Sequence, residues 1–302
     1  MKIWQYIVLA LKGCAMGTAD VVPGVSGGTI AFISGIYEEL IESIRSVDAT
    51  ALRLLAKLRF AEFWRRIHGW FLLPVLLGIG TAVFSLARLM TYLLENHPVA
   101  VWSFFFGLIV ASALLVARQV GRWDWRSAAA LCVGVAVAWW ITVATPAETP
   151  ETWWFVMLSG AIAICAMILP GISGAYILLL LGKYQFILQA VSDLNMPVIL
   201  VFLAGAVVGL ISFSHLLAWL LRRWHDATIA VLMGFMIGSL NKVWPWKEVL
   251  ETYVDSHGKI QPLVESNIWP ERFDAQALVL CAAGFALIYG VELAARAIGK
   301  RR

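Results

Sequence analysis

The chain has 302 residues, of which 61% are hydrophobic and only 14% are charged, and its formal net charge is +4. Soluble domains carry about 25% charged residues, so this composition excludes an ordinary soluble fold and predicts an all-α polytopic membrane protein. The small positive charge lies in loops, which indicates membrane topology and gives no reason to expect nucleic-acid binding. The four cysteines lie in apolar segments without metal-ligand spacing, and we expect no metal site and no cofactor.

The first half of the chain begins with an apolar stretch over residues 3–17 that is too short to cross a bilayer. A Pro-Gly break follows, and the chain becomes apolar again from about 29 to 43, so we expect a hairpin over residues 1–43. Basic and apolar side chains alternate over 44–70, which predicts an amphipathic helix on the membrane surface. Three spans are then expected, at 71–94, 99–117 and 127–145.

The second half follows the same plan. Its apolar stretch over 153–169 leads into a second break, and we expect a second hairpin over residues 153–191. The long loop at 244–274 is polar and contains more acidic than basic residues. Three further spans are expected, at 197–221, 227–243 and 275–295.

A short motif occurs once in each hairpin. Pro23-Gly24-Val25-Ser26-Gly27-Gly28 returns 147 residues later as Pro170-Gly171-Ile172-Ser173-Gly174-Ala175. The spans repeat at a second spacing of 127 residues and then at 149. The spacing of 147 also relates Gly35 to Gly182 and Tyr37 to Tyr184. The spacing of 127 relates Gly78 to Gly205, Gly107 to Gly234 and Ser112 to Ser239, and that of 149 relates Leu131-Cys132 to Leu280-Cys281. We therefore expect two repeats, 1–145 and 146–302, within one transmembrane domain.

Loop charges predict the orientation of these repeats. The basic loops are 44–70, 118–126, 222–226 and the C-terminal tail, whereas 95–98, 146–152, 192–196 and 244–274 are poor in basic residues. Basic loops stay in the cytoplasm, so both termini are expected there and the six spans alternate without conflict. Each motif hairpin must then be re-entrant, although residues 171–191 are long enough to cross as a complete helix. Three crossings per half make the two repeats inverted relative to each other.

The motifs have the chemistry of an anion site. A Pro-Gly break before a Ser/Gly-rich helix start leaves N–H groups pointing out of a positive helix end, where an anion is favoured. In a membrane, paired breaks of this kind in two halves indicate a transporter binding site. The candidate phosphate-binding residues are Ser26, Gly27, Gly28, Thr29, Ser173 and Gly174. The alternative is that the hydroxyl groups only cap their helices.

Four further polar residues are candidates. Arg88 lies within a span, and the 127-residue spacing places His215 opposite it. A charge at this depth needs a partner or a role, and we expect Arg88 to coordinate phosphate, with His215 as its counterpart or as a proton-linked switch. The alternative for both is a structural ion pair or snorkelling to the interface. Asp20 and Glu38 are candidates for the coupling-ion site. The alternatives are a helix cap for Asp20 and a solvated helix face for Glu38.

The sequence resembles a known family in these motifs. The run from Gly17 to Thr29, followed by Gly35-Ile36-Tyr37-Glu38, looks like the N-terminal signature of the bacterial polyprenyl-phosphate transporters of the PopT type, long catalogued as a domain of unknown function. The second motif, Pro170 to Tyr184, matches this family as well. The resemblance covers essentially the whole chain. It implies a non-enzymatic, ion-coupled flippase of the bacterial inner membrane, which returns undecaprenyl phosphate to the inner leaflet for peptidoglycan and other envelope glycan synthesis.

Two other classes of function remain open. Undecaprenyl-pyrophosphate phosphatases of the UppP type also carry Pro-Gly-x-Ser hairpins, but there an arginine follows the serine, whereas Gly27 and Gly174 stand here. Phosphoryl transfer without a metal needs dense positive charge and an activated nucleophile, and neither motif provides them. An ion exchanger or channel is the other alternative. The expected mechanism is alternating access with the phosphate held between the hairpin tips and H⁺ or Na⁺ as the coupling ion.

Overall fold

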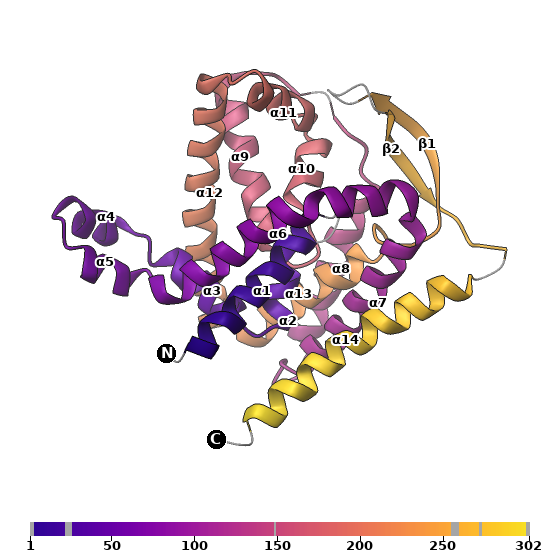
Figure 1. The fold of residues 1–302 in the computed structure, drawn as a ribbon, viewed down its shortest axis with the longest axis horizontal. Helices are drawn as coiled ribbons and strands as arrows, with labels where there is room; N and C mark the ends of the chain where they lie inside the picture. The colour runs from indigo at the N-terminus through magenta and orange to yellow at the C-terminus, as the bar shows by residue number, and fades with distance from the viewer. Residues whose placement is uncertain (1–2, 22–25, 148, 255–259, 272–273, 300–302) are drawn as a thin grey trace.

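The computed structural model describes residues 3–21, 26–147, 149–254, 260–271 and 274–299, and most of them are helical (Figure 1). The first predicted hairpin contains three helices, α1 (Ile3–Val21), α2 (Gly27–Ile33) and α3 (Tyr37–Arg45). The second contains α9 (Trp153–Ile168), α10 (Gly174–Leu180) and α11 (Tyr184–Ser192). Helices α2 and α10 begin 147 residues apart, and so do α3 and α11.

The same glycine turn joins the two short helices in each hairpin. Gly35 has φ +71° and Gly182 has φ +61°, values that favour glycine because its missing Cβ removes the steric penalty. The amide that follows each glycine bonds back into the preceding helix: Ile36 N donates to Ala31 O, and Lys183 N donates to Leu178 O. Helices α10 and α11 meet at an angle of 109°, so residues 171–191 do not form one straight helix.

The prediction of one surface helix over 44–70 is wrong, because the structure has more than one short helix there. The segment contains the end of α3 and two short helices, α4 (Ala49–Ala56) and α5 (Phe60–Arg66), which project from the body of the molecule (Figure 1). The chain turns between them at Leu58, which has φ +55°. Asp48 caps α4 by accepting from the N–H groups of Thr50 and Ala51, and its carboxylate also pairs with Arg66 at the end of α5.

The longer helices match the predicted spans in position. They are α6 (Gly69–Asn96), α7 (Pro98–Ala117), α8 (Trp125–Val143), α12 (Met196–Arg223), α13 (His225–Ser239) and α14 (Ala275–Gly299). Among the described residues, α6, α7, α8 and α12 are long and apolar enough to cross a membrane, and the bent pair α10–α11 would make a fifth span. The prediction of six full spans is therefore met only in part. Helix α13 has 15 residues, and at about 1.5 Å per residue it is shorter than a bilayer core.

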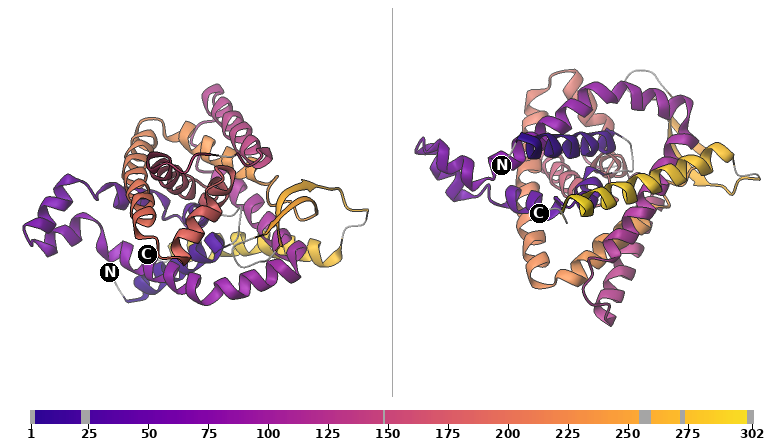
Figure 2. Two further views of the ribbon diagram at one scale, coloured as in Figure 1. Left: turned by 90° about the horizontal axis from the view of Figure 1, so that it is seen from above. Right: turned by 60° about the horizontal axis from the view of Figure 1, so that its bottom comes forward.

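Helix packing joins the two halves of the chain. Helix α1 lies along α6, and its counterpart α9 lies along α12 (Figure 1). The remaining helices pair across the halves, since α14 packs on α7 and α13 packs on α8 (Figure 2). Neither half therefore contains all the packing partners of its own helices.

Glycines at the crossings allow this packing. A Cβ on Gly107 would lie 1.9 Å from the carbonyl oxygen of Cys281, and one on Gly234 would lie 2.5 Å from that of Leu131. Only residues without a side chain let the helix backbones approach so closely. Gly107 and Gly234 are 127 residues apart, and each lies at such a close crossing.

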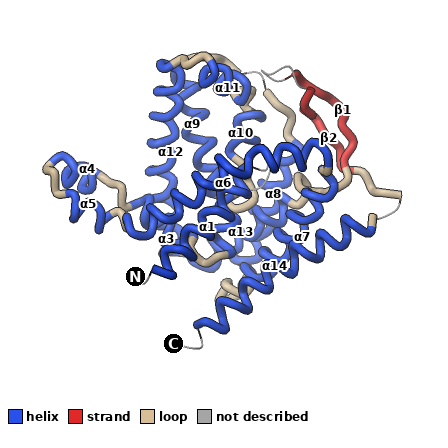
Figure 3. Tube along the Cα trace, viewed as in Figure 1, coloured by secondary structure: helices blue, strands red, loops and turns tan. Residues whose placement is uncertain are grey.

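A small two-stranded sheet lies beside the helices of this mostly α-helical protein. Strands β1 (Lys247–Val254) and β2 (Ile260–Asn267) pair antiparallel within the segment predicted to be a long polar loop (Figure 3). Val249, Thr252, Tyr253 and Val254 are β-branched or aromatic residues of the kind that favour strands. The segment was predicted to be a loop because its acidic residues make it polar.

The predicted basic loops lie close together at one face. Arg222, at the end of α12, pairs with Glu42 of α3, and Asp226 accepts from the N–H groups of Gly121 and Arg122. These contacts bring the loops 118–126 and 222–226 together and place Arg222 beside α3. In the loop 146–152, which is poor in basic residues, Ala147 N donates to Leu180 O at the end of α10.

Candidate functional site

The two motifs, 147 residues apart in sequence, meet inside the molecule. The Ser26 hydroxyl donates to the carbonyl oxygen of Met167 at 2.9 Å, and the Gly171 N–H donates to the Thr29 hydroxyl at 2.9 Å. Tyr37 adds a third link, from its hydroxyl to the carbonyl oxygen of Ile168 at 3.2 Å. Ser26, Thr29 and Tyr37 are all buried. Residues 22–25 of the first motif lie outside the described part of the chain.

Glycine makes this close approach possible. A Cβ on Gly28 would lie 2.4 Å from the carbonyl oxygen of Ile168, at the end of α9. Gly171 has φ +84°, and a Cβ there would lie 2.7 Å from the carbonyl oxygen of Phe235 on α13. At Gly28 there is no room for a side chain. At Gly171 there is no room either, and the backbone is also in the left-handed region that favours glycine. Gly28 thus allows close contact between the halves, whereas Gly171 packs closely against α13 of its own half.

At the start of α2, protein groups already occupy the N–H donors. Gly27 N donates to Asp20 Oδ1 at 2.7 Å, Gly28 N donates to the Ser26 hydroxyl at 3.0 Å, and Thr29 N donates to the Ser26 carbonyl oxygen. The Asp20 carboxylate lies where the helix end favours a negative charge. It therefore takes the position that we expected a substrate anion to take, and an arriving anion must compete with it.

The start of α10 differs from that of α2. Ser173 has the extended backbone of a helix cap and is 7% exposed, but its side chain makes no capping hydrogen bond among the described residues. Met167 stands in the second half where Asp20 stands in the first, so α10 has no corresponding carboxylate. Gly174 packs against α9, where a Cβ would lie 2.5 Å from the carbonyl oxygen of Ala163. The two motifs are alike in sequence, but the polar groups at their helix starts have different hydrogen-bond partners.

The structure does not bring His215 or Glu38 to the motifs. His215 is exposed on α12, and its Nδ1 lies 2.8 Å from the carbonyl oxygen of Ile211 in the same helix. Arg88 belongs to α6, but its side chain lies outside the described part of the structure. Glu38 is exposed on the basic face, where its Oε1 lies 3.3 Å from Nε2 of His225. His225, which links α3 to α13 there, was not singled out in the sequence.

A polar cavity that the sequence did not reveal lies beside α10. It measures about 360 Å³, and Tyr176 of α10, the end of α8 and the foot of the β-hairpin line it. Lys242, Lys247 and Glu265 meet in its wall, with the Glu265 Oε2 atom 3.1 Å from each Nζ atom. The signal available in the sequence was that two lysines lie on a side otherwise poor in basic residues. In the described residues we find no group of three or more His, Cys, Asp or Glu that could hold a metal ion.

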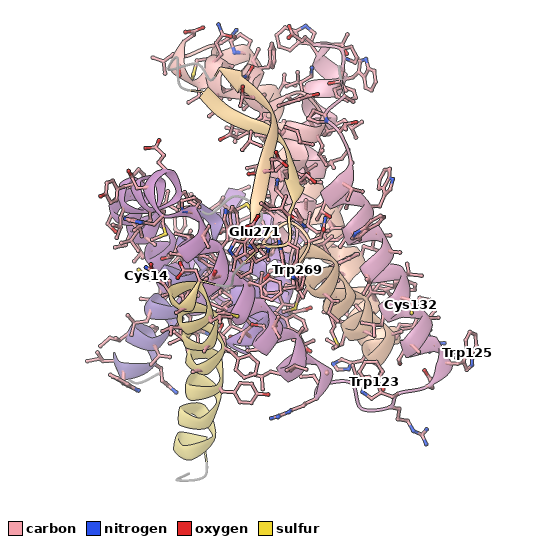
Figure 4. All side chains as sticks on the ribbon, turned by 90° about the vertical axis from the view of Figure 1, so that its right-hand side faces the viewer. Cys14, Trp123, Trp125, Cys132, Trp269 and Glu271 are labelled. Atoms are coloured by element: carbon pink, nitrogen blue, oxygen red, sulfur yellow. The ribbon has the colours of Figure 1, made fainter. Side chains whose placement is uncertain are left out.

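Aromatic side chains mark two levels of the molecule. Trp123 and Trp125 lie near the start of α8, and Trp269 lies just beyond β2 at a different level (Figure 4). Trp269 stacks on Trp244, with ring centroids 5.4 Å apart. Tryptophan is enriched at both interfaces of a membrane protein, which agrees with a chain that contains several apolar helices.

Comparison with known proteins adds an independent finding. Residues 16–261 match the family described as "Undecaprenyl phosphate translocase-like". The chain is similar to a polyprenyl-phosphate transporter from Vibrio cholerae serotype O1, with 47% identity over 96% of this chain and 97% of that protein. It is also similar to a polyprenyl-phosphate transporter from Staphylococcus aureus, with 32% identity over 78% of this chain and 85% of that protein. No solved structure matches the chain.

Proposed function

Because the chain belongs to the undecaprenyl phosphate translocase-like family, a family of membrane transporters rather than enzymes, we propose that it moves undecaprenyl phosphate across the bacterial cytoplasmic membrane. As a flippase, it would return the lipid carrier to the inner leaflet for reuse in peptidoglycan and other envelope glycan synthesis. The observation that carries the proposal is the contact between the two motifs through Ser26, Thr29 and Gly171. Paired helix breaks that meet between two halves are typical of transporter binding sites.

The proposal includes two inverted repeats, 1–145 and 146–302, with both termini in the cytoplasm. Support comes from the equal spacing of the helices in the two halves and from the gathering of the basic loops at one face. Each motif then forms the tip of a re-entrant hairpin, and the 109° bend between α10 and α11 fits this arrangement. The contact between the tips opens and closes as packed groups of helices, which mix both halves, move against each other.

At the tips, the phosphate binds to the N–H and hydroxyl groups of both motifs. The residues assigned to it are Ser26, Gly27, Gly28, Thr29, Ser173 and Gly174, with Arg88 supplying charge and His215 taking part in the other conformation. Asp20 gives the proposal a route to proton coupling. A proton on the Asp20 carboxyl removes its negative charge and weakens its bond to Gly27 N–H, which the phosphate can then accept. Glu38 is the second candidate for the coupling ion, and Na⁺ is the alternative to H⁺.

The test is transport in reconstituted vesicles. An impermeant probe reports the leaflet distribution of undecaprenyl phosphate, with and without a pH gradient and with a sodium gradient as a separate arm. We expect the purified protein to speed redistribution and a pH gradient to drive it. We expect Asp20→Asn to equilibrate the lipid without following the gradient, because the side chain can no longer gain a proton.

Two matched variants make this test specific. Asp193→Asn, an exposed residue beyond α11, makes the same chemical change and should behave as the wild type. Ser26→Ala should lose transport, whereas Ser212→Ala on the exposed side of α12 should keep it. Normal gradient-driven transport by both Asp20→Asn and Ser26→Ala would refute the assigned site.

A further inference from the structure

The polar cavity beside α10 has a net positive wall. Among the described residues that line it, Lys242 and Lys247 carry positive charge and Glu265 alone carries negative charge. Glu265 accepts one hydrogen bond from each lysine at 3.1 Å, and Lys247 also donates to the carbonyl oxygen of Lys242 at 2.6 Å. An ammonium group has three N–H donors. Within the described part of the chain, Lys242 donates one of these hydrogen bonds and Lys247 donates two, so N–H groups of both lysines remain for a further anion.

Aromatic rings hold these lysines in place. The Nζ atom of Lys242 lies 4.7 Å from the centroid of the Tyr176 ring, and that of Lys247 lies 4.7 Å from the centroid of the Trp102 ring. The side chain of Lys247 is only 7% exposed. Cation–π contacts and burial fix a charge that would otherwise move freely on its long stem. The two ammonium groups are thus preorganised at the cavity wall.

An apolar groove adjoins the polar cavity. It measures about 340 Å³ and shares Asn241 and Asn267 with the cavity. The rest of its lining is mostly apolar and comes from α7, α8, α13 and the segment after α13, the larger residues being Phe106, Val135, Trp139, Ile237, Leu240 and Trp244. A polar cavity that opens onto an apolar groove suits an amphiphile with a small anionic head.

The position of this pair of sites favours a lipid over a soluble anion. Trp139 in the groove is 53% exposed, and Trp244 stacks on Trp269, as expected at a membrane interface. Tyr176 in the cavity is three residues beyond Ser173, which is about one turn of α10 from the second motif. A head group bound here therefore lies at interface level and next to the contact between the motifs.

We propose that the cavity and groove together bind a prenyl phosphate, with the phosphate on Lys242 and Lys247 and the first isoprene units in the groove. This inference deepens the proposed function and rests on it for the class of lipid. Glu265 acts as a displaceable counter-ion, since its carboxylate holds both ammonium groups until the phosphate takes its place. The site is a waiting position for the lipid on the side that loop charges predict to be extracytoplasmic.

The experiment measures binding to the purified full-length protein in detergent. The probes are farnesyl phosphate, farnesol and inorganic phosphate. We expect farnesyl phosphate to bind most tightly, and Lys242→Gln and Lys247→Gln each to weaken its binding about tenfold by removing a charge-assisted bond. Lys57→Gln, an exposed lysine after α4, makes the same change elsewhere and should have no effect.

Two further variants guard against misfolding as an explanation. Glu265→Gln removes the competing carboxylate and should tighten binding, a gain that a damaged protein would not show. Trp139→Ala removes a wall of the groove and should weaken farnesyl phosphate but leave inorganic phosphate unchanged. Trp140→Ala, the exposed neighbour outside the groove lining, is its control.

The outcomes separate the inference from the proposed function. Equal affinity of all the lysine and Glu265 variants for farnesyl phosphate would overturn the site. Equal binding of inorganic phosphate and farnesyl phosphate, with no effect of Trp139→Ala, would overturn the lipid assignment in favour of free phosphate. If binding depends on the lysines but the wild type moves no undecaprenyl phosphate in vesicles, the site stands and the transport proposal fails. If transport occurs and binding ignores the lysines, only the site fails.

Discussion

Ser26 and Ser173 occupy equivalent places in the two motifs but do different work. The Ser26 hydroxyl accepts from Gly28 N and donates to the carbonyl oxygen of Met167, so it caps α2 and also ties α2 to α9. Ser173 is buried at the start of α10 without a capping bond among the described residues. From the sequence, the same two roles were predicted for both serines, helix capping or anion binding. The choice between them depends on neighbours that come from the opposite half of the chain.

This difference predicts unequal effects on stability. Ser26→Ala removes a helix cap and a buried hydrogen bond, which together contribute about 1–3 kcal/mol. Ser173→Ala removes neither and should change stability by less than about 0.5 kcal/mol. Thermal unfolding of both variants in the same detergent compares them directly, with the wild type as reference. Equal losses of stability would contradict the asymmetry of the two motifs.

Lys247 predicts a pH dependence of lipid binding. Its burial, together with the nearby charge of Lys242, lowers the pKa of its ammonium group to about 8, although Glu265 acts in the opposite direction. Lys242, Glu265 and the hydroxyl group of Tyr176 are the other titratable groups that face the cavity. The protonated lysine binds the anion, and the proton is lost as pH rises through 8.

Farnesyl phosphate should therefore bind less tightly as pH rises from about 7 to 9. The phosphate itself has lost its second proton by pH 7, since that pKa is about 6, and does not contribute to the change. Titration calorimetry across this range measures the effect. Lys247→Gln should abolish the dependence, and a wild-type affinity that stays constant to pH 9 would be inconsistent with a role for this lysine.

At the scale of elements, the pairing of helices depends on small residues at the crossings. Gly107 on α7 faces the backbone of α14, and Gly78 on α6 faces that of α1, where a Cβ would lie 2.0 Å from the carbonyl oxygen of Ala10. Association of helices in a membrane relies on such close packing because lipid provides no hydrophobic driving force between them. Hydropathy predicted where most of these helices lie in the sequence, but it cannot predict which helix packs against which.

A pair of glycine substitutions tests this packing. Gly107→Ala places a methyl group against the carbonyl of Cys281 and should destabilise the protein by about 1–3 kcal/mol through overpacking. Gly80→Ala, on α6, meets no described atom within 4 Å and should stabilise the helix by up to about 1 kcal/mol. The midpoints of thermal unfolding should move in opposite directions. Similar shifts for the two variants would mean that the crossing of α7 and α14 is not as close as described.

Two elements were beyond the reach of sequence patterns. Residues 171–191 are apolar throughout, and their length permits a single helix, but Gly182 takes a left-handed backbone and turns the chain by 109° between α10 and α11. The strands β1 and β2 follow several apolar spans and lie in a segment rich in charge, where their alternation is weak. The bend depends on the left-handed backbone of Gly182, and the strands depend on their pairing with each other.

At the scale of the whole molecule, the two halves are interlocked. Helix α14 of the second half packs on α7 of the first, and α8 of the first packs on α13 of the second. The motifs add hydrogen bonds across the same boundary. A movement that gives access to alternate sides must therefore take place between packed groups of helices that mix both halves, and not between residues 1–145 and 146–302 as two separate bodies.

The proposed topology predicts which surfaces a membrane-impermeant reagent can reach. In a background without the four native cysteines, Gln119→Cys, beyond α7, should react only from the cytoplasmic side. Glu271→Cys, beyond β2, should react only from the opposite side (Figure 4). Thiol labelling of intact cells and of opened membranes measures both. Labelling of both positions from the same side would exclude the proposed orientation.

Taken without any fold, the sequence determined that the chain is a membrane protein, where most of its apolar helices lie, and that one motif occurs twice, 147 residues apart. It could do so because apolar length and motif repetition are properties of the chain itself. The tertiary structure alone decided that Ser26 bonds to the end of α9 and Thr29 to the second motif, that Asp20 accepts from the N–H of Gly27, and that Lys242 and Lys247 share Glu265. These contacts join residues distant in sequence, and only the packing of α1, α9, α10 and the β-hairpin around one another brings them within hydrogen-bonding distance.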